Sequence, residues 1–548
     1  MRLLSRFTRE DYDSQEDFEN HYRLNIPENF NFARDVVDEY ARIAPMQRAM
    51  LYVNDAGEEK TFTFLDIRQG SIRAANALLK LGIRPGDPVL LMLKRRYEYW
   101  MIALGLMRIG AIQIPATHQL QKKDIVYRIQ ASSAKMVICV GEDETCAHVS
   151  GAAAECPDLI GAACLGGRRE GFIDFDAEMA AASLDEPNYP SPEGIMLMYF
   201  TSGTTGFPKM VAHDFNYPLG HTITGAFWHN LDDTSLHLTV ADTGWAKCGW
   251  GKFYGQWVAG ACLFVYDFDR FRADRMLSML AKYRVTSFCA PPTVFRFLIK
   301  EDFSKYDLSA LRWGNVAGEP LNPEVYSQFY KATGVKLREG FGQTEGTPFL
   351  LTTKWMEPHP GSVGVPSPHY RIRLLDEDGR DVEAGEEGEI CVDLSQGKPA
   401  GLLMGYYRDP EHTAEAFAGG VYHTGDMAWR DEDGYYWFIG RADDVIKSSG
   451  YRIGPFEVES ALLEHPAVLE CAIIGVPDPD RGQVVKASVL LAKGYTPSDE
   501  LRKELQNHVK KVTAPYKYPR ILEFVDELPR TFSGKLQRKK LREENAKR

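Results

Sequence analysis

The chain reads Tyr199-Phe-Thr-Ser-Gly-Thr-Thr-Gly-Phe-Pro-Lys209, and the first two residues of this stretch end an apolar run, Ile195 to Phe200. The run predicts a strand that leads into a loop with two glycines and four hydroxyl side chains. Glycine can take positive φ and lets backbone N–H groups close on an anion, while the hydroxyls and a lysine add donors and positive charge. We therefore predict a loop that binds a triphosphate, formed by Thr201, Ser202, Gly203, Thr204, Thr205, Gly206 and Lys209.

Two other interpretations of this loop need weighing. A Walker A loop requires a lysine followed by Ser or Thr, whereas Lys209 follows Pro208 and precedes Met210. An ordinary surface turn can have the same Ser, Thr and Gly composition. The order of the residues, rather than their composition, favours the phosphate loop.

In this order the loop resembles the signature of the adenylate-forming superfamily, which includes acyl-CoA synthetases, luciferases and the adenylation domains of peptide synthetases. Five further motifs similar to those of the family follow in the expected order: Ala317-Gly-Glu-Pro320, Gly340-Phe-Gly-Gln-Thr-Glu345, Tyr422-His-Thr-Gly-Asp426, Gly440-Arg-Ala-Asp-Asp-Val-Ile-Lys447 running into Ser449-Gly-Tyr-Arg-Ile-Gly454, and Pro529-Arg-Thr-Phe-Ser-Gly-Lys535. Six motifs in order make chance a poor explanation. The resemblance covers residues 30 to 540 and is closest to short- and medium-chain acyl-CoA synthetases.

Length and composition indicate a soluble protein of several domains. A chain of 548 residues is too long for one ordinary core. Its composition, 44% hydrophobic and 26% charged, is typical of a globular protein. The net charge of −12 gives no whole-chain attraction for nucleic acid or an anionic membrane. No apolar run approaches the roughly 18 residues of a membrane span.

The cysteines and the N-terminal segment predict a cytoplasmic location. The nine cysteines form no C-x-x-C pair and no zinc-ligand spacing, so reduced thiols are the simplest interpretation. The first twenty residues lack the apolar core of a signal peptide and carry six acidic side chains.

Alternating strand and helix patterns predict an α/β fold. We expect strands at 88–93, 111–115, 136–140, 235–240, 261–266 and 287–290, and helices at 31–44, 63–81, 97–109, 273–283 and 294–299. Residues 370–375 and 388–392 alternate as antiparallel strands do and predict a small β-barrel or meander. The Gly- and Ala-rich segment 151–186 has little pattern and is interpreted as variable surface.

These elements predict two domains. An N-terminal domain, residues 1–440, has two doubly wound sheets plus the small β-barrel. A small, mobile α+β domain, residues 441–548, has helices at 455–464 and 498–512 and strands at 468–476 and 485–491.

The resemblance implies a reaction in two halves. A carboxylate attacks the α-phosphorus of ATP to give acyl-AMP and pyrophosphate, and the thiol of CoA then displaces AMP. Glu345 is implied to hold Mg²⁺, in keeping with the oxygen ligands this cation prefers. Lys535 is implied to bridge the substrate carboxylate and the α-phosphate, with Thr204 and Lys209 as further catalytic residues.

The nucleotide-binding residues follow from the same resemblance. Asp426 can accept hydrogen bonds from both ribose hydroxyls, and Arg441 can hold the same sugar or a phosphate oxygen. Arg452 is expected to meet phosphate during adenylation. The remaining implied residues are Gly318, Glu319 and Pro320 along the adenine edge, Phe341 stacked on its face, and Glu339, Gly340, Gly342, Gln343 and Thr344.

For thioester formation, the family rotates its C-terminal domain about the position of Asp443, which withdraws Lys535. The rotation is implied to bring Ser449, Gly450 and Tyr451 to the active site, with Gly450 leaving room for a pantetheine tunnel. Arg481 and Lys510 match positions that hold the nucleotide of CoA in relatives, although a plain salt-bridged surface role remains open for both.

The implied acyl pocket is larger than one for acetate. Gly342 stands where the acetate-specific branch has a tryptophan. Expected walls are Trp228, Trp245, Lys247, Trp250 and Cys289. A buried lysine is costly unless paired, so Lys247 should extend to solvent, pair with a carboxylate or shorten the pocket. Rigid aromatic walls favour branched, alicyclic or aromatic acids of short to medium length.

The sequence therefore predicts an AMP-forming acyl-CoA synthetase, an acid–thiol ligase that uses ATP, Mg²⁺ and CoA. Loading of an acyl carrier protein, a catalytically silent nucleotide-binding protein and luciferase-like oxygen chemistry are the alternatives. The pattern from Pro529 to Lys535 also matches one that lysine acetyltransferases recognise in this family, so Lys535 is a candidate for acetylation. Both a monomer and a homodimer remain open.

Overall fold

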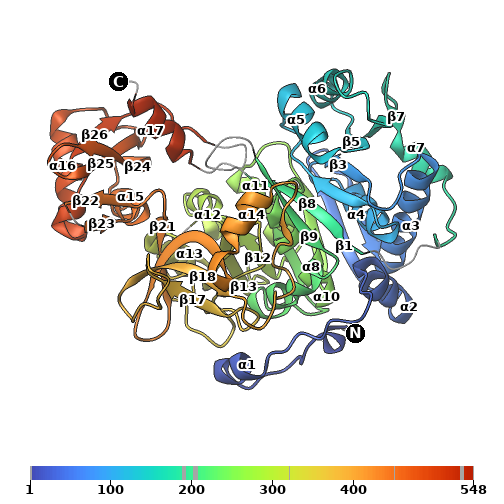
Figure 1. The fold of residues 1–548 in the computed structure, drawn as a ribbon, viewed down its shortest axis with the longest axis horizontal. Helices are drawn as coiled ribbons and strands as arrows, with labels where there is room; N and C mark the ends of the chain where they lie inside the picture. The colour runs from blue at the N-terminus through green and yellow to red at the C-terminus, as the bar shows by residue number, and fades with distance from the viewer. Residues whose placement is uncertain are drawn as a thin grey trace.

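A computed structural model describes residues 3–187, 193–201, 208–319, 321–449, 451–530 and 536–546. The chain forms a large α/β body, with a smaller C-terminal unit at one side (Figure 1). Among the helices of the described ranges, none has both the length and the apolar character that crossing a bilayer requires.

The first sheet has eight strands. Their order is β19 (Gly405–Tyr406), β9 (Lys209–Asp214), β8 (Ile195–Thr201), β4 (Ile112–Pro115), β3 (Pro88–Met92), β5 (Met136–Val140), β6 (Gly161–Leu165) and β7 (Ile173–Asp174). The strands from β8 to β7 are parallel, whereas β9 runs antiparallel to both of its neighbours. The helices of this half are α3 (Phe64–Lys80), α4 (Glu98–Arg108), α5 (Lys122–Ser132), α6 (Asp143–Ala153) and α7 (Phe175–Ala181).

Helix α3 shows how the sequence sets these boundaries. The side chain of Thr63 accepts from the backbone N–H of Asp66, and the Asp66 carboxylate accepts from Thr63, which forms a capping box. At the other end, Gly82 takes a positive φ of 99°, a conformation that favours glycine and stops the helix.

The second sheet has nine strands. Their order is β16 (Val365–Pro366), β15 (Leu350–Leu351), β14 (Leu337–Phe341), β13 (Trp313–Ala317), β12 (Ser287–Ala290), β10 (Leu236–Thr239), β11 (Cys262–Asp267), β1 (Arg48–Asn54) and β2 (Glu59–Thr63). Strands β14 to β1 are parallel along this path, so their carboxyl ends meet at one edge. The helices are α8 (Tyr217–Gly220), a π-helical turn (Thr224–Trp228), α9 (Ala246–Gly251), α10 (Tyr254–Val258), α11 (Ala273–Lys282), α12 (Pro292–Leu298) and α13 (Pro323–Thr333).

One hydrophobic core joins the two sheets. It contains Leu91 and Leu197 from the first sheet, Met50 and Leu263 from the second, and the fully buried Trp257 of α10. The two sheets are therefore parts of one body rather than independent domains.

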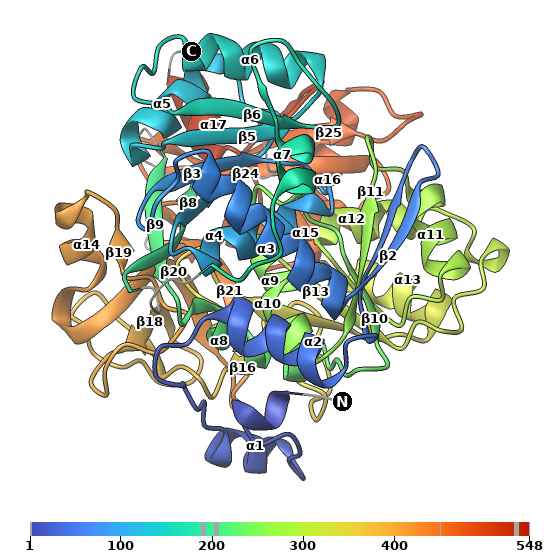
Figure 2. The ribbon, with the colours of Figure 1, turned by 90° about the vertical axis from the view of Figure 1, so that its right-hand side faces the viewer.

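The N-terminal segment packs on this body through aromatic rings. Helix α1 (Gln15–His21) buries Phe18, whose ring centroid lies 5.0 Å from that of Trp355. A π-helical segment (Ala33–Asp38) then continues into α2 (Glu39–Ile43). Figure 2 shows α1 at the opposite end of the molecule from the C-terminus.

A smaller antiparallel sheet follows. Its strand order is β17 (Ile372–Leu375), β18 (Glu387–Asp393), β20 (Val421–Arg430) and β21 (Tyr436–Arg441), and α14 (Pro410–Ala416) precedes β20. Strands β18 and β20 pair irregularly: Glu389 lies opposite Met427, but Cys391 lies opposite His423. The extra residues of β20 form a bulge in which Gly425 has a φ of 67°.

The C-terminal unit has its own core. Its sheet contains β23 (Tyr451–Ile453), β22 (Ile446–Ser448), β25 (Gly482–Leu491), β24 (Val468–Asp478) and β26 (Ile521–Phe524), with α15 (Pro455–Leu463), α16 (Asp499–Val512) and α17 (Arg538–Ala546). Its two buried clusters contain only residues from Ile446 onward. The predicted domain boundary at residue 440 falls at the end of β21.

The predicted α/β architecture is confirmed, but one segment was misinterpreted. Residues 151–186, expected as patternless surface, contain β6, β7 and α7. Strand β6 reads Gly-Ala-Ala-Cys-Leu, without the β-branched and aromatic residues that mark a strand, and it forms because β5 pairs along its full length.

Candidate active site

The predicted phosphate loop joins two antiparallel strands. Thr201 at the end of β8 lies opposite Lys209 at the start of β9. Ser202, Gly203, Thr204, Thr205 and Gly206 lie outside the described residues. The Lys209 ammonium lies 4.8 Å from the ring centroid of Tyr406, which β19 places beside β9.

Glu345 adjoins this lysine. The Tyr406 hydroxyl donates to Glu345 Oε1 at 3.1 Å. Burial raises the pKa of Glu345, whereas Tyr406, Arg441 and Lys209 act to lower it. One half-buried carboxylate beside two cations fits a Mg²⁺ that takes most of its other ligands from phosphate and water.

Asp426 lies at the centre of a hydrogen-bonded network. Its side chain, 7% exposed, accepts from the amide of Gln343 at 2.5 Å and lies 3.7 Å from Arg441 Nη1. The Tyr422 hydroxyl donates to Gln343 Oε1 at 2.8 Å, which fixes the orientation of that amide. Arg441 also donates to the carbonyl of Thr424 at 3.0 Å. The network holds the carboxylate in place to accept from vicinal hydroxyls.

Two glutamates predicted to bind the nucleotide, Glu319 and Glu339, are hydrogen-bonded to the protein. Glu319 accepts from the Thr293 hydroxyl at 2.8 Å. Glu339 accepts from the backbone N–H groups of Leu321 at 2.8 Å and Gly361 at 3.1 Å. Burial raises the pKa of Glu339 to about 8. The Glu339 side chain therefore holds the loop after β13, and its backbone carbonyl accepts from the backbone N–H of Thr352 at 3.0 Å and from Trp228 Nε1 at 3.2 Å.

The other predicted nucleotide-binding residues of this region lie at or just after the ends of β13 and β14. Gly318 has a φ of 101°, and the ring of Phe341 lies 5.8 Å from that of Phe438. The carbonyl of Thr344 is hydrogen-bonded to His213 Nε2 at 2.8 Å. Pro320 lies outside the described residues.

Tryptophan rings lie so close to the backbone at Gly340 in β14 and at Gly342 just after it that only glycine fits at these two positions. A Cβ at Gly340 would lie 2.7 Å from Trp228 Cζ2, and one at Gly342 would lie 2.4 Å from Trp250 Cη2. No real Cβ tolerates such contacts, so each glycine makes room for an indole. Gly342 therefore does not open free space, because Trp250 already fills it.

A small cavity lies between these indoles and the ends of β10, β12 and β13. Its lining consists of Trp228, Thr239, Val240, Lys247, Trp250, Gly251, Cys289, Ala290, Pro291 and Ala317. Its volume of about 20 Å³ has room for one water molecule, so a larger group needs Trp250 or Lys247 to move.

Four of the predicted acyl-pocket residues line this cavity, namely Trp228, Lys247, Trp250 and Cys289, and Gly342 contacts Trp250 from behind. Trp245 is not among the described residues of the lining. The sequence interpretation missed Thr239 and Ala290, although both end parallel strands, where such folds place their ligands.

The predicted CoA-binding residues lie on the C-terminal unit. Ser449 donates its backbone N–H to the carbonyl of Arg481 at 3.0 Å, so the two share one surface. The exposed ring of Tyr451 stacks on Tyr516 with centroids 4.0 Å apart. The Lys510 ammonium lies 4.0 Å from the ring centroid of Tyr518, in the same loop as Tyr516. Gly450 lies outside the described residues.

Arg452 pairs with a carboxylate of the predicted N-terminal domain. Its guanidinium pairs at 2.5 Å with Glu377, in the turn between β17 and β18, and Lys447 lies 3.5 Å from the same carboxylate. Asp443, the predicted hinge, lies 3.6 Å from Arg441 Nε. Lys535 lies outside the described residues.

Comparisons with known proteins agree with this arrangement. Residues 37–407 match the family described as AMP-binding enzyme, and residues 457–535 match its C-terminal domain. The mitochondrial acyl-coenzyme A synthetase ACSM3 of Mus musculus is 41% identical over 98% of this chain and 94% of its own length. ACSM4 of Homo sapiens, of the same description, is 43% identical over 96% of this chain and 93% of its own. The crystal structure of the anthranilate CoA ligase AuaEII with anthranoyl-AMP superposes with a TM-score of 0.87 at 30% identity, over 95% of this chain and 98% of that one.

Proposed function

The chain belongs to the AMP-binding enzyme family, and on this premise we propose that it activates a carboxylic acid with ATP and transfers the acyl group to CoA. It is an AMP-forming acyl-CoA synthetase, an acid–thiol ligase that uses ATP, Mg²⁺ and CoA. The observation that carries the adenylation step is the buried Asp426 network beside Glu345 and Lys209.

In the first half-reaction, the carboxylate attacks the α-phosphorus and pyrophosphate leaves. Negative charge grows on the phosphates, and Lys209 at the base of the loop offsets it. Mg²⁺ held by Glu345 would neutralise further phosphate charge. Tyr406 keeps the Glu345 carboxylate oriented through its hydroxyl, 3.1 Å away.

Asp426 and Gln343 hold the nucleoside. Asp426 accepts from the ribose hydroxyls, and the Gln343 amide keeps the carboxylate in place. Because Gln343 is itself held by Tyr422, the site is ordered before the nucleotide binds. Orientation, rather than acid–base chemistry, is what this network contributes.

In the second half-reaction, the thiol of CoA attacks the acyl carbonyl and AMP leaves. We propose that Ser449, Gly450 and Tyr451 line the entry for pantetheine, and that Arg481 and Lys510 meet the phosphates of CoA. The shared surface of Ser449 and Arg481 supports this placement. Tyr451 is exposed and free to contact a ligand on its outer face.

We propose that the acid is branched, alicyclic or aromatic and of short to medium length. The indoles of Trp228 and Trp250 give flat aromatic walls, Lys247 limits the depth of the cavity, and the acid enters when Trp250 or Lys247 moves aside. A panel of straight, branched, alicyclic and aromatic acids, assayed by pyrophosphate release, tests this proposal. A preference for long straight chains would contradict it.

Loading of a carrier protein is the second candidate. The discriminating experiment supplies acyl-AMP with either CoA or a phosphopantetheinylated carrier protein and measures the thioester by mass spectrometry. Efficient turnover of CoA alone supports the ligase.

We keep a cytoplasmic location as a proposal. All nine cysteines lie within the described residues as buried free thiols, which suits a reducing compartment. The names of the relatives place those proteins in mitochondria. Fractionation of the source cells decides between the two.

A further inference from the structure

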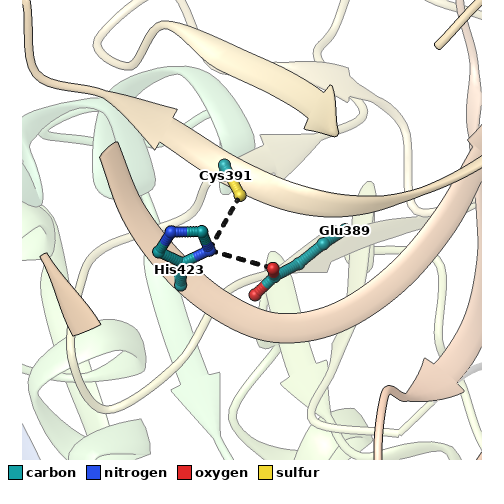
Figure 3. A group of neighbouring side chains, drawn as sticks. All are labelled: Glu389, Cys391 and His423. Carbon is teal, nitrogen blue, oxygen red and sulfur yellow. Dashed lines mark hydrogen bonds and ion pairs between the residues drawn. The ribbon is translucent and has the colours of Figure 1, made fainter. Parts of the chain in front are cut away.

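Three side chains with different ligand chemistry meet where β18 and β20 pair irregularly. Glu389 and Cys391 extend from β18, and His423 extends from β20 (Figure 3). His423 Nδ1 lies 2.9 Å from Glu389 Oε2 and 3.6 Å from Cys391 Sγ. The three ligand atoms all lie within 4.8 Å of one another. A carboxylate, a thiol and an imidazole thus converge on one point.

The ligand set suits zinc rather than magnesium. Thiolate, imidazole and carboxylate are the ligands of tetrahedral Zn²⁺, whereas Mg²⁺ takes oxygen ligands. With Zn–S of about 2.3 Å and Zn–N of about 2.0 Å, a tetrahedral angle separates sulfur and nitrogen by about 3.5 Å. The separation in this structure is 3.6 Å.

The contact between the carboxylate and the imidazole needs only a small adjustment. Nitrogen and oxygen ligands of one tetrahedral ion lie about 3.3 Å apart. The Glu389–His423 contact of 2.9 Å would therefore lengthen by roughly 0.4 Å on this geometry. Such a shift is within the reach of side-chain rotation.

Solvent can reach the point where the ligands converge. The side chains of His423 and Glu389 are 34% and 24% exposed, whereas Cys391 is buried beneath them. The exposed side leaves room for water as a fourth ligand, as in zinc sites with three protein ligands. Binding replaces the thiol proton of Cys391, which is released to solvent.

The same glutamate is oriented by the protein. Its other oxygen, Oε1, accepts from the backbone N–H of Gly425 at 2.8 Å. Metal-ligating side chains in proteins are commonly held by such outer hydrogen bonds. Gly425 immediately precedes Asp426, so Glu389 is hydrogen-bonded to the turn that carries the ribose-binding carboxylate.

We propose that Glu389, Cys391 and His423 form a binding site for one Zn²⁺ ion or a similar borderline transition metal, completed by water. Sequence spacing does not reveal it, because the ligands come from two strands and the bulge of β20 decides that His423 faces Cys391.

The test titrates the full-length protein with Zn²⁺ by calorimetry, in excess Mg²⁺ and without ATP, whose phosphates bind zinc. Cobalt(II) replaces zinc in a parallel titration, since a thiolate ligand gives a charge-transfer absorption band. The wild type should bind one equivalent of Zn²⁺ and show the band. Cys391→Ala should abolish the band and weaken Zn²⁺ binding by at least about tenfold, and His423→Gln should weaken binding to a similar degree.

Cys146→Ala is the matched control, because Cys146 is also a buried free thiol but lies on α6, remote in sequence from both strands. It should retain both the affinity and the band. Thermal unfolding of each variant confirms that it is folded. Equal Zn²⁺ affinity in the wild type and Cys391→Ala, or a wild type that binds no zinc under these conditions, would overturn the proposal.

Discussion

Replacing Trp250 by alanine tests where the acyl group binds. The indole lines the cavity, packs edge-on against Trp228 with centroids 6.5 Å apart and presses on Gly342. Its removal joins a new space to a cavity of about 20 Å³, so longer or more branched acids can enter. Each additional buried methylene contributes about 0.8 kcal/mol. Since about 1.4 kcal/mol is a factor of ten, kcat/KM should rise about fourfold per methylene relative to the wild type, until the new space is filled.

The variant will also be less stable. A large-to-small change at a buried aromatic costs about 3–5 kcal/mol of unfolding free energy, which denaturant unfolding measures. The assay, pyrophosphate release across a series of acids, must therefore run at a temperature where both proteins are folded. Trp245→Ala is the matched control. It also removes an indole, but Trp245 is half-buried and does not line the cavity.

Two results would refute the placement of the acyl group. One is a Trp250→Ala enzyme that keeps the wild-type order of preference among acids. The other is a Trp245→Ala enzyme whose preference shifts as far as that of Trp250→Ala.

Four further predictions follow from the site. Asp426→Asn should lower kcat/KM for ATP about 10- to 100-fold, because it loses charge-assisted hydrogen bonds worth about 1.5–3 kcal/mol; an unchanged value would remove Asp426 from the ribose site. Lys535→Ala should slow adenylation by about 100-fold or more and spare thioester formation from pre-made acyl-AMP. Acetylation of Lys535 should have the same effect. Equal loss of rate in both half-reactions would contradict domain rotation. Gly450→Leu should leave acyl-AMP formation intact and block transfer to CoA, whereas normal CoA turnover would place the tunnel elsewhere. Burial raises the pKa of Glu339 from 4.5 to about 8, so the folded state binds more protons between these values and the free energy of unfolding should fall as pH rises through this window. Glu339→Gln should flatten that fall. If the wild type and the variant lose stability in parallel as pH rises, the pH dependence comes from other groups.

The sequence predicted the fold and the order of the site elements because local patterns carry both. The apolar spacing predicts a helix at 63–81, and the structure has it at Phe64–Lys80. Strand β6 was missed because its pairing with β5, not its composition, forms it.

Contacts between distant segments could not be predicted in the same way. From the sequence, Gly342 implied a pocket larger than one for acetate, because the acetate-specific branch has a tryptophan at this position. The structure instead puts the ring of Trp250 within 2.4 Å of a Cβ at that position. Gly342→Trp would displace Trp250 before it shortens the pocket. Likewise, the salt bridge of Arg452 with Glu377 joins residues of different domains, which no motif describes.

The central claim, that a carboxylate attacks the α-phosphorus of ATP, is tested most directly with an acid labelled with oxygen-18 in both carboxyl oxygens. After one complete turnover with ATP and CoA, mass spectrometry of the products should find one labelled oxygen in AMP and one in the acyl-CoA. AMP without label, or ADP in place of AMP, would contradict adenylation as the route of activation.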